Sequence, residues 1–183
     1  REESFITRAI ASWRANPNIR VLGNQDAWRL SILSFVVRNG DGVLHHNFVV
    51  ALLNDLFGIQ ARGGCSCAGP YGHRLLGIDQ TTSRSFECAI VEGAEGIKPG
   101  WVRVNFNYFI SETVFEYLLA AVHLVATEGW KLLPHYAFDV ATGTWRHATR
   151  RSVAALSLGD VTYQGGKMSY RARHATEPEW ALA

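Results

Sequence analysis

The residues with the most chemical potential lie in one glycine-rich stretch. Cys65 and Cys67 are separated by a single serine, and four glycines fall within residues 63–72. Glycine adopts backbone conformations that other residues avoid, so such a loop can approach a ligand closely. The nearby Arg62 and Arg74 would favour the thiolate, which is the nucleophilic form of cysteine. The stretch therefore indicates a cysteine nucleophile, and the alternatives are a buried structural cysteine or a metal site that adds a histidine.

A second candidate is Arg103, in the middle of the alternating segment WVRVNFNYF at 101–109. Alternation places Val102 and Val104 on one face of a strand, and Arg103 and Asn105 on the other. An arginine inside a sheet needs an anionic partner, and a bidentate contact with a carboxylate suits its planar group. We expect Arg103 to bind a carboxylate ligand or to pair with a carboxylate of the protein.

The remaining polar motifs do not predict a catalytic or nucleotide-binding site. His45 and His46 come directly before an apolar helical pattern, so we expect them to serve its first turn. The glycine-rich stretch lacks the G-x-x-x-x-G-K-[ST] spacing that holds nucleotide phosphates. These residues predict no nucleotide site.

The composition restricts the class of protein. The chain has 183 residues, 48% of them hydrophobic and 19% charged, with a formal net charge of +2. This balance fits one globular domain with an extension, and the interleaved charges argue against a nucleic-acid or membrane-surface partner. No apolar run approaches the ~20 residues that span a bilayer. Three cysteines do not make a disulfide framework, so we expect a reducing, cytoplasmic compartment.

Helices and strands are predicted from apolar spacing. Three- and four-residue spacing predicts helices at 3–15, 45–57 and 111–129. Apolar or alternating runs predict strands at 19–22, 30–37, 59–62 and 101–109. A hairpin is expected to turn at Thr142-Gly143, and residues 74–99 are expected to be irregular, with SFECAIVEG as their one strand-like piece.

This order of elements predicts an α+β fold. It would be a small antiparallel or mixed sheet with helices packed on one face, followed by a C-terminal β-hairpin extension. The other face, carrying Arg103 and the glycine-rich stretch, would be free for a ligand.

The segment ARGGCSCAGPYGH resembles the active-site loop of class V (NifS-like) aminotransferases, in particular cysteine desulfurases and selenocysteine lyases. In that family the loop reads approximately R-x-G-x-x-C-A, which Arg62, Gly64, Cys67 and Ala68 match. The two histidines that often precede the family's cysteine are replaced here by Cys65 and serine.

A second segment, WVRVNFNYFISETVFEYLL, resembles the family's V-R-x-S-x-x-x-Y-N-T-x-x-E-[IV]-D motif. Arg103 matches the arginine that binds the substrate carboxylate. The resemblance covers roughly residues 18–133. It implies a family small domain over 1–133, with an excursion at 74–99 and an extension at 134–183.

The resemblance also implies an activity. Cys67, or else Cys65, would accept sulfur from a small amino-acid substrate as a persulfide, while Arg103 and Arg62 bind the substrate carboxylate. The family's cofactor is pyridoxal phosphate, bound through a lysine that follows a histidine in a large N-terminal domain. None of the three lysines here follows a histidine. We therefore expect no cofactor-binding or metal-binding residues in this chain.

On this basis the chain would be part of a longer, homodimeric enzyme whose cofactor domain belongs to the same polypeptide, and would be inactive by itself. Two alternatives stay open. The chain could belong to a class V aminotransferase or epimerase in which the cysteine is not catalytic, or it could be a non-catalytic binding module.

Overall fold

The computed structural model describes residues 1–64, 69–149 and 158–170. The chain divides into two compact units, Arg1–Ala148 and Thr149–Ala183, which are described separately. Within the described ranges, no helix combines the length and the hydropathy needed to cross a membrane.

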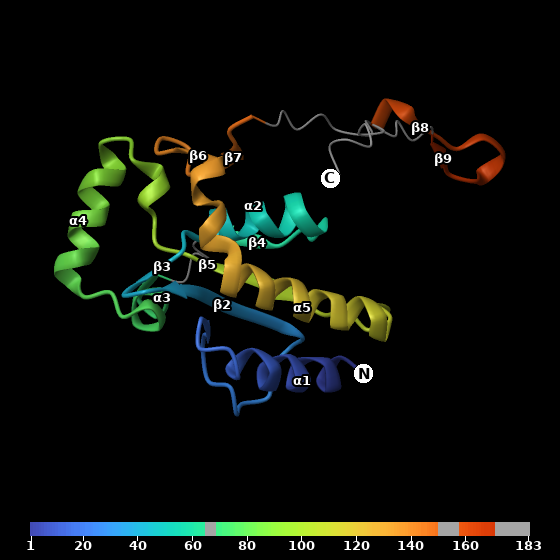
Figure 1. Ribbon diagram of the computed structural model, residues 1–183, viewed down its shortest axis with the longest axis horizontal. Coiled ribbons are helices and arrows are strands. Elements are labelled where there is room, and N and C mark those ends of the chain that lie inside the picture. The colour runs from blue at the N-terminus through green and yellow to red at the C-terminus, as the bar shows by residue number, and fades with distance from the viewer. Residues whose placement is uncertain (65–68, 150–157, 171–183) are drawn as a thin grey trace. The chain divides into compact units, whose positions relative to one another are not determined.

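The first unit is built on one antiparallel sheet (Figure 1). The strand order is β1-β2-β5-β4, and β3 pairs with β2. The strands are Ile19–Val21 (β1), Ile32–Asn39 (β2), Gly42–Val43 (β3), Arg62–Gly64 (β4) and Trp101–Asn105 (β5). All four strand pairs are antiparallel, so the expected α+β fold is confirmed.

Three helices pack on one face of this sheet. They are Glu2–Arg14 (α1), His46–Phe57 (α2) and Glu112–Glu128 (α5). Along β2 and β5 every second residue is buried in this core: Leu33, Phe35, Val37, Val102 and Val104. The largest side chains of this core are Trp13, Phe5, Phe35, Phe48, Phe106 and Phe115. The periodic apolar spacing of the sequence therefore located the core helices correctly.

Local capping explains where two of these helices begin and where α2 ends. The His45 side chain accepts a hydrogen bond from the backbone N–H of Asn47 at the start of α2. Ser111 accepts one from Val114 at the start of α5. Gly58 ends α2 in the left-handed conformation, at φ +65°, which glycine adopts without strain. The expectation that His45 serves the first helical turn is confirmed.

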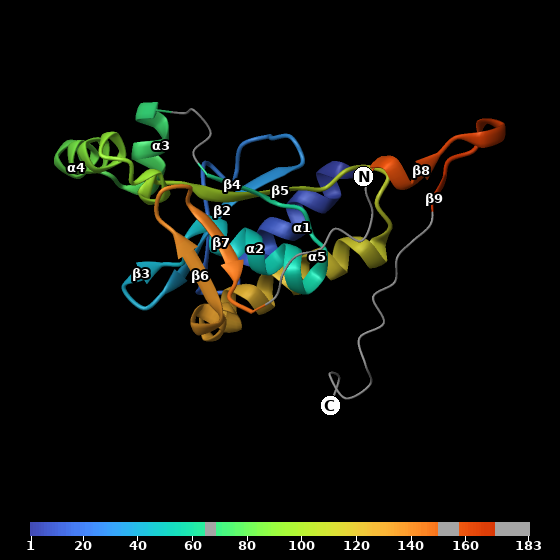
Figure 2. The same cartoon turned by 90° about the horizontal axis from the view of Figure 1, so that it is seen from above.

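The opposite face of the sheet is only partly free, which corrects the expectation. Leu22, Val36 and Trp101 form a small buried cluster on that face. Leu75 and Leu76 of the helix Gly69–Leu76 (α3) pack against it. Figure 2 shows α3 and the β1–β2 loop on the side of the sheet away from α2 and α5.

The segment expected to be irregular is mostly helical. It contains α3, the helix Gln80–Val91 (α4) and a short 3₁₀ turn, Glu95–Ile97. The strand-like run SFECAIVEG lies largely within α4, and Asp79 caps that helix by accepting from the N–H of Thr82. The prediction was wrong because a short apolar run has no period long enough to separate helix from strand.

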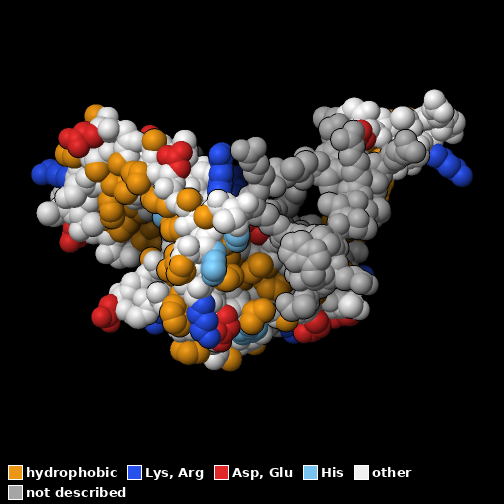
Figure 3. Space-filling model, turned by 45° about the horizontal axis from the view of Figure 1, so that its top comes forward, with side chains coloured by type: hydrophobic (Ala, Val, Ile, Leu, Met, Phe, Trp, Pro, Cys, Tyr) orange, Lys and Arg blue, Asp and Glu red, His pale blue; other side chains and the backbone are white. Residues whose placement is uncertain are grey.

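None of the residues of α4 is buried, and Val91 is 82% exposed. In the space-filling view of Figure 3, apolar side chains gather on the lobe at the left, where Figure 1 places α4.

A 3₁₀ segment, Gly129–His135, leads from α5 into a hairpin of Tyr136–Asp139 (β6) and Thr144–His147 (β7). Gly143 has φ +68°, so the predicted turn is confirmed. The hairpin packs on α2, with the rings of Phe48 and Trp145 centred 4.8 Å apart. It therefore belongs to the first unit, and the division between units falls later than residue 133.

The described part of the second unit is small. It holds Leu158–Asp160 and Gln164–Gly166, both 3₁₀, and the strands Val161–Thr162 (β8) and Ser169–Tyr170 (β9). The two strands pair antiparallel.

Candidate functional site

The structure brings Arg62 and Arg103 together. They are directly opposite one another in the antiparallel pairing of β4 with β5. On the other side of β5, Arg103 is opposite Ser34 of β2. Residues directly opposite in such a ladder point to the same face, with Cβ atoms about 5 Å apart. Arg62, Arg103 and Ser34 therefore form a row across three strands, which we call the arginine row.

The arginine row lies on the face that carries α3. Val102 and Val104, which flank Arg103 along β5, are buried in the core on the opposite face. Arg103 is half-buried and Arg62 is exposed. Like charges directly opposite in a sheet are destabilising unless something neutralises them.

No carboxylate among the described residues neutralises this pair. The ion pairs that the described chain forms join Arg8 to Glu112 and Glu116, Lys98 to Glu95, and Lys131 to Glu128. Each guanidinium presents N–H donors in a planar arrangement that matches a carboxylate, and the two arginines share one face of the sheet. The arginine row can therefore bind an external carboxylate.

The predicted nucleophile follows the arginine row in the sequence. Cys65 comes directly after Gly64, the last residue of β4, and Cys67 is two residues further on. Both cysteines lie outside the described residues, so their roles remain predictions. Cys88, the third cysteine, is an exposed free thiol on α4.

His45 is held as a neutral structural residue. Its Nδ1 accepts hydrogen bonds from the backbone N–H of Asn47 and, at 3.1 Å, from the indole N–H of Trp145. These two donors assign the ring proton to Nε2, which donates to the Gly96 carbonyl at 2.8 Å. Burial lowers the pKa of His45, while the Gly96 hydrogen bond raises it. His45 thus joins α2 to the hairpin and to the 3₁₀ turn.

His46 lies beneath the end of β4. Its ring stacks on His45 with centroids 4.3 Å apart, and its side chain is only 9% exposed. A Cβ added to Gly100 would lie 2.8 Å from its Cε1, and one added to Gly64 would lie 3.9 Å from its Nε2. Burial, and secondarily the neighbouring His45, lowers the pKa of His46 to about 4. The imidazole is therefore neutral at pH 7 and lies against the backbone just before Cys65.

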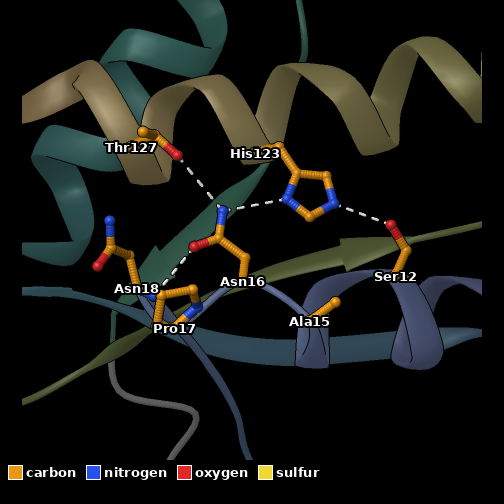
Figure 4. Close-up of a pocket in the computed structure, with 7 residues that line it drawn as sticks. All are labelled: Ser12, Ala15, Asn16, Pro17, Asn18, His123 and Thr127. Atoms are coloured by element: carbon orange, nitrogen blue, oxygen red, sulfur yellow. Dashed lines mark hydrogen bonds between the residues drawn. The ribbon is translucent and has the colours of Figure 1, made fainter.

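A further polar cluster joins the end of α1 to α5 and lines a surface pocket (Figure 4). Asn16 Nδ2 approaches His123 Nδ1 at 3.1 Å, and Ser12 Oγ lies 2.8 Å from His123 Nε2. Asn16 Oδ1 accepts from the backbone N–H of Asn18, which fixes the orientation of the Asn16 amide.

This arrangement contains the residue types of a Ser–His–Asn nucleophile, but its protons are in the wrong places. Asn16 donates to Nδ1, so His123 carries its proton on Nε2 and donates it to Ser12. A histidine in that tautomer cannot remove the serine proton. The cluster therefore fastens two helices together. This polar cluster was not predicted from the sequence, although Ser12 with Asn16 and His123 with Thr127 each show helical i, i+4 spacing.

The described lysines are not placed as a site for pyridoxal phosphate would require. The family's cofactor needs a lysine enclosed with it in a binding site, but Lys98 and Lys131 are exposed and paired with glutamates. Lys167 is exposed in the second unit. Across the described ranges, no three His, Cys, Asp or Glu side chains gather as a metal site would require.

No family model matches the sequence, and no match was found among curated proteins.

Proposed function

We propose that this chain is the carboxylate-binding part of a cytoplasmic, class V (NifS-like) pyridoxal-phosphate enzyme that acts on a small amino acid. The observation that carries the proposal is the cross-strand register of Arg62 with Arg103. The resemblance to the family assigns the same two arginines to the substrate carboxylate. The cofactor would be held by another domain, because the lysines of this chain do not fit it.

The arginine row would fix the substrate by its carboxylate. A half-buried arginine loses less of its binding energy to water than an exposed one, so Arg103 would be the principal contact. Arg62 would add a second charged donor, and Ser34 a neutral one. Holding one end of a small substrate in this way orients the rest of it before reaction.

Cys67 would accept sulfur from the bound substrate. It follows Gly64, the last residue of β4, by three positions in the sequence. In this proposal the thiolate attacks the substrate sulfur and a persulfide forms on the protein. The carbon–sulfur bond breaks with its electron pair on the carbon, which the cofactor of the other domain would stabilise until a proton is added and alanine leaves.

The arginines can be tested in the polypeptide that includes the cofactor domain. Charged hydrogen bonds contribute about 1.5–3 kcal/mol each, so Arg103→Gln should lower kcat/KM at least about 10-fold. Arg62→Gln should lower it less, because Arg62 is exposed. The control variant Arg14→Gln changes an exposed arginine on α1 and should leave kcat/KM unchanged. An unchanged kcat/KM in Arg103→Gln would refute the proposal.

The sulfur step has a separate test. Cys67→Ala should abolish persulfide formation from cysteine, while Cys65→Ala should preserve it. If desulfuration survives in Cys67→Ala, the sulfur role of Cys67 is wrong. Transamination or epimerisation that survives only with the arginines intact would then identify a non-sulfur member of the class.

A further inference from the structure

The helix α4 lies at one edge of the first unit, with its outer side uncovered (Figure 1). No residue of α4 is buried against the described part of the chain, although Phe86 and Ile90 on its inner side are half-buried. A helix of 12 residues is marginal in water by itself, and most residues of α4 are of types with low helix propensity. Packing of the outer side against a partner would supply the stability that this sequence lacks.

An open groove runs along the outer side of α4, between two ridges of side chains. One ridge consists of three small residues at i, i+4 spacing: Thr81, Ser85 and Ala89. The other ridge has the same spacing, with a charge at each end and a small residue between: Arg84, Cys88 and Glu92. Two helices commonly pack by placing such i, i+4 ridges into each other's grooves. The outer side of α4 therefore has the form of a surface that accepts another helix.

The charged ridge is complementary to a reversed copy of itself. Arg84 lies four residues before Cys88, and Glu92 lies four residues after it. If two copies of α4 pack antiparallel about a two-fold axis at Cys88, Arg84 of each copy lies opposite Glu92 of the other copy. A parallel pair would instead place like charges opposite one another. In the part of the chain that the structure describes, neither Arg84 nor Glu92 forms an ion pair, so both are available for this contact.

We propose that the outer side of α4 binds the same surface of a second copy of this chain, as an antiparallel helix pair with two-fold symmetry. Each copy would place its charged ridge in the groove of the other, and the small side chains of Ser85 and Ala89 would let the two helices approach closely. Two Arg84–Glu92 ion pairs would form, one at each end of the contact. This inference goes beyond the proposed function and does not depend on the arginine row.

The contact would be small, because 12 residues of helix extend over only about 18 Å. Interfaces that bury less than about 1,200 Å² are typical of weak, reversible complexes. We therefore expect a dissociation constant in the micromolar range, with single chains and pairs in rapid exchange.

Sedimentation equilibrium of the full chain over a range of concentrations tests this proposal. An ionic strength of about 0.1 M limits the measurement to charges that lie close together. The unmodified chain should dimerise reversibly. Arg84→Glu and Glu92→Arg should each weaken dimerisation at least about 10-fold, because each variant would place like charges opposite one another at both ends of the contact. The matched control is Glu87→Arg, which makes the same change of charge on α4 outside both ridges and should leave the dissociation constant unchanged.

An equimolar mixture of the two reversed variants gives the sharpest result. Arg84→Glu has two negative ends on its ridge and Glu92→Arg has two positive ends, so each repels itself and attracts the other. The mixture should dimerise as tightly as the unmodified chain. The double variant Arg84→Glu/Glu92→Arg should also recover dimerisation, because it restores opposite charges at both ends. Both recoveries require an antiparallel contact through these two positions, and they also show that the variants are folded.

Three results would overturn the proposal. If the unmodified chain stays monomeric at every concentration, a partner of another kind covers α4. If dimerisation is not weakened by either single variant, the contact lies on another surface. If both variants weaken it but their mixture does not recover, the two charges do not face one another across the pair. Arg84 and Glu92 lie outside the arginine row, so none of these results affects the carboxylate role of Arg103.

Discussion

Three glycines surround the imidazole of His46, at the point where β4 ends. A Cβ added to Gly63 of β4 would lie 3.3 Å from its ring, one added to Gly64 of the same strand 3.9 Å, and one added to Gly100, just before β5, 2.8 Å. The glycines thus let two backbone segments approach one ring, which no other residue type would permit. Two predictions follow from this packing at the residue scale.

Gly100→Ala should destabilise the protein. The new methyl group would lie 2.7 Å from the Gly64 carbonyl carbon, and backbone cannot rotate away as a side chain can. Overpacking of this kind costs about 1–3 kcal/mol, which urea unfolding can measure. Gly42→Ala is the matched control, because its nearest neighbour would be 3.8 Å away, and it should change stability by less than about 0.5 kcal/mol. Equal stabilities of the two variants would contradict the packing described here.

Stability should fall as the pH drops from 7 to 5, partly through His46. Its pKa is about 4 in the folded state, against an ordinary value of 6.5. The unfolded chain therefore binds the proton first, and stability present above pH 6.5 is lost as the pH falls toward 4. By pH 5 the loss from this residue approaches about 2 kcal/mol. His46→Gln should flatten the dependence of unfolding free energy on pH in this window, but not between pH 7 and 9. An unaltered slope would show that His46 is not the titrating group.

At the scale of elements, capping decides where the longest helix starts. Ser111→Ala removes the oxygen that accepts from the Val114 N–H at 3.1 Å. We expect a loss of about 1 kcal/mol in unfolding free energy, because one N–H at the helix start loses its partner. Ser111→Asp keeps an acceptor and adds a favourable charge, so it should retain full stability. If Ser111→Ala and Ser111→Asp have the same unfolding free energy, the cap does not stabilise the helix.

At the scale of the whole molecule, the β6–β7 hairpin completes the first unit. Trp145 and Tyr136 cover Phe48 of α2, with ring centroids 4.8 and 5.4 Å away. The backbone of Gly96 also donates to the Val140 carbonyl of the hairpin. Removing the hairpin would expose a core phenylalanine and leave His45 without its Trp145 partner.

A chain of residues 1–148 should therefore unfold cooperatively by itself. A chain of residues 1–133 should be less stable by at least about 1.5–3 kcal/mol, because exposing one fully buried aromatic ring costs that much. Urea unfolding followed by tryptophan fluorescence can compare them. A residue 1–133 chain as stable as the longer one would show that the sheet and α2 do not need the hairpin.

The sequence by itself determined the core helices, the strand around Arg103 and the α+β fold, whereas the antiparallel pairing of all the strands is seen in the structure. Each depends on local rules: apolar spacing of 3.6 or 2, a capping side chain before a helix, and a glycine after it. The two arginines could also be chosen from motifs. Where apolar periodicity was short, as in SFECAIVEG, the local signal could not separate strand from helix.

Only the tertiary structure decided which residues meet. The register of β4 with β5 puts Arg62 opposite Arg103, and a slip of one residue would have placed the two side chains on different faces. The neutral tautomer of His123 likewise depends on Ser12 and Asn16, which lie more than 100 residues away in the sequence. Pairing register and burial are set by the packing of the whole sheet, so no local stretch of sequence contains them.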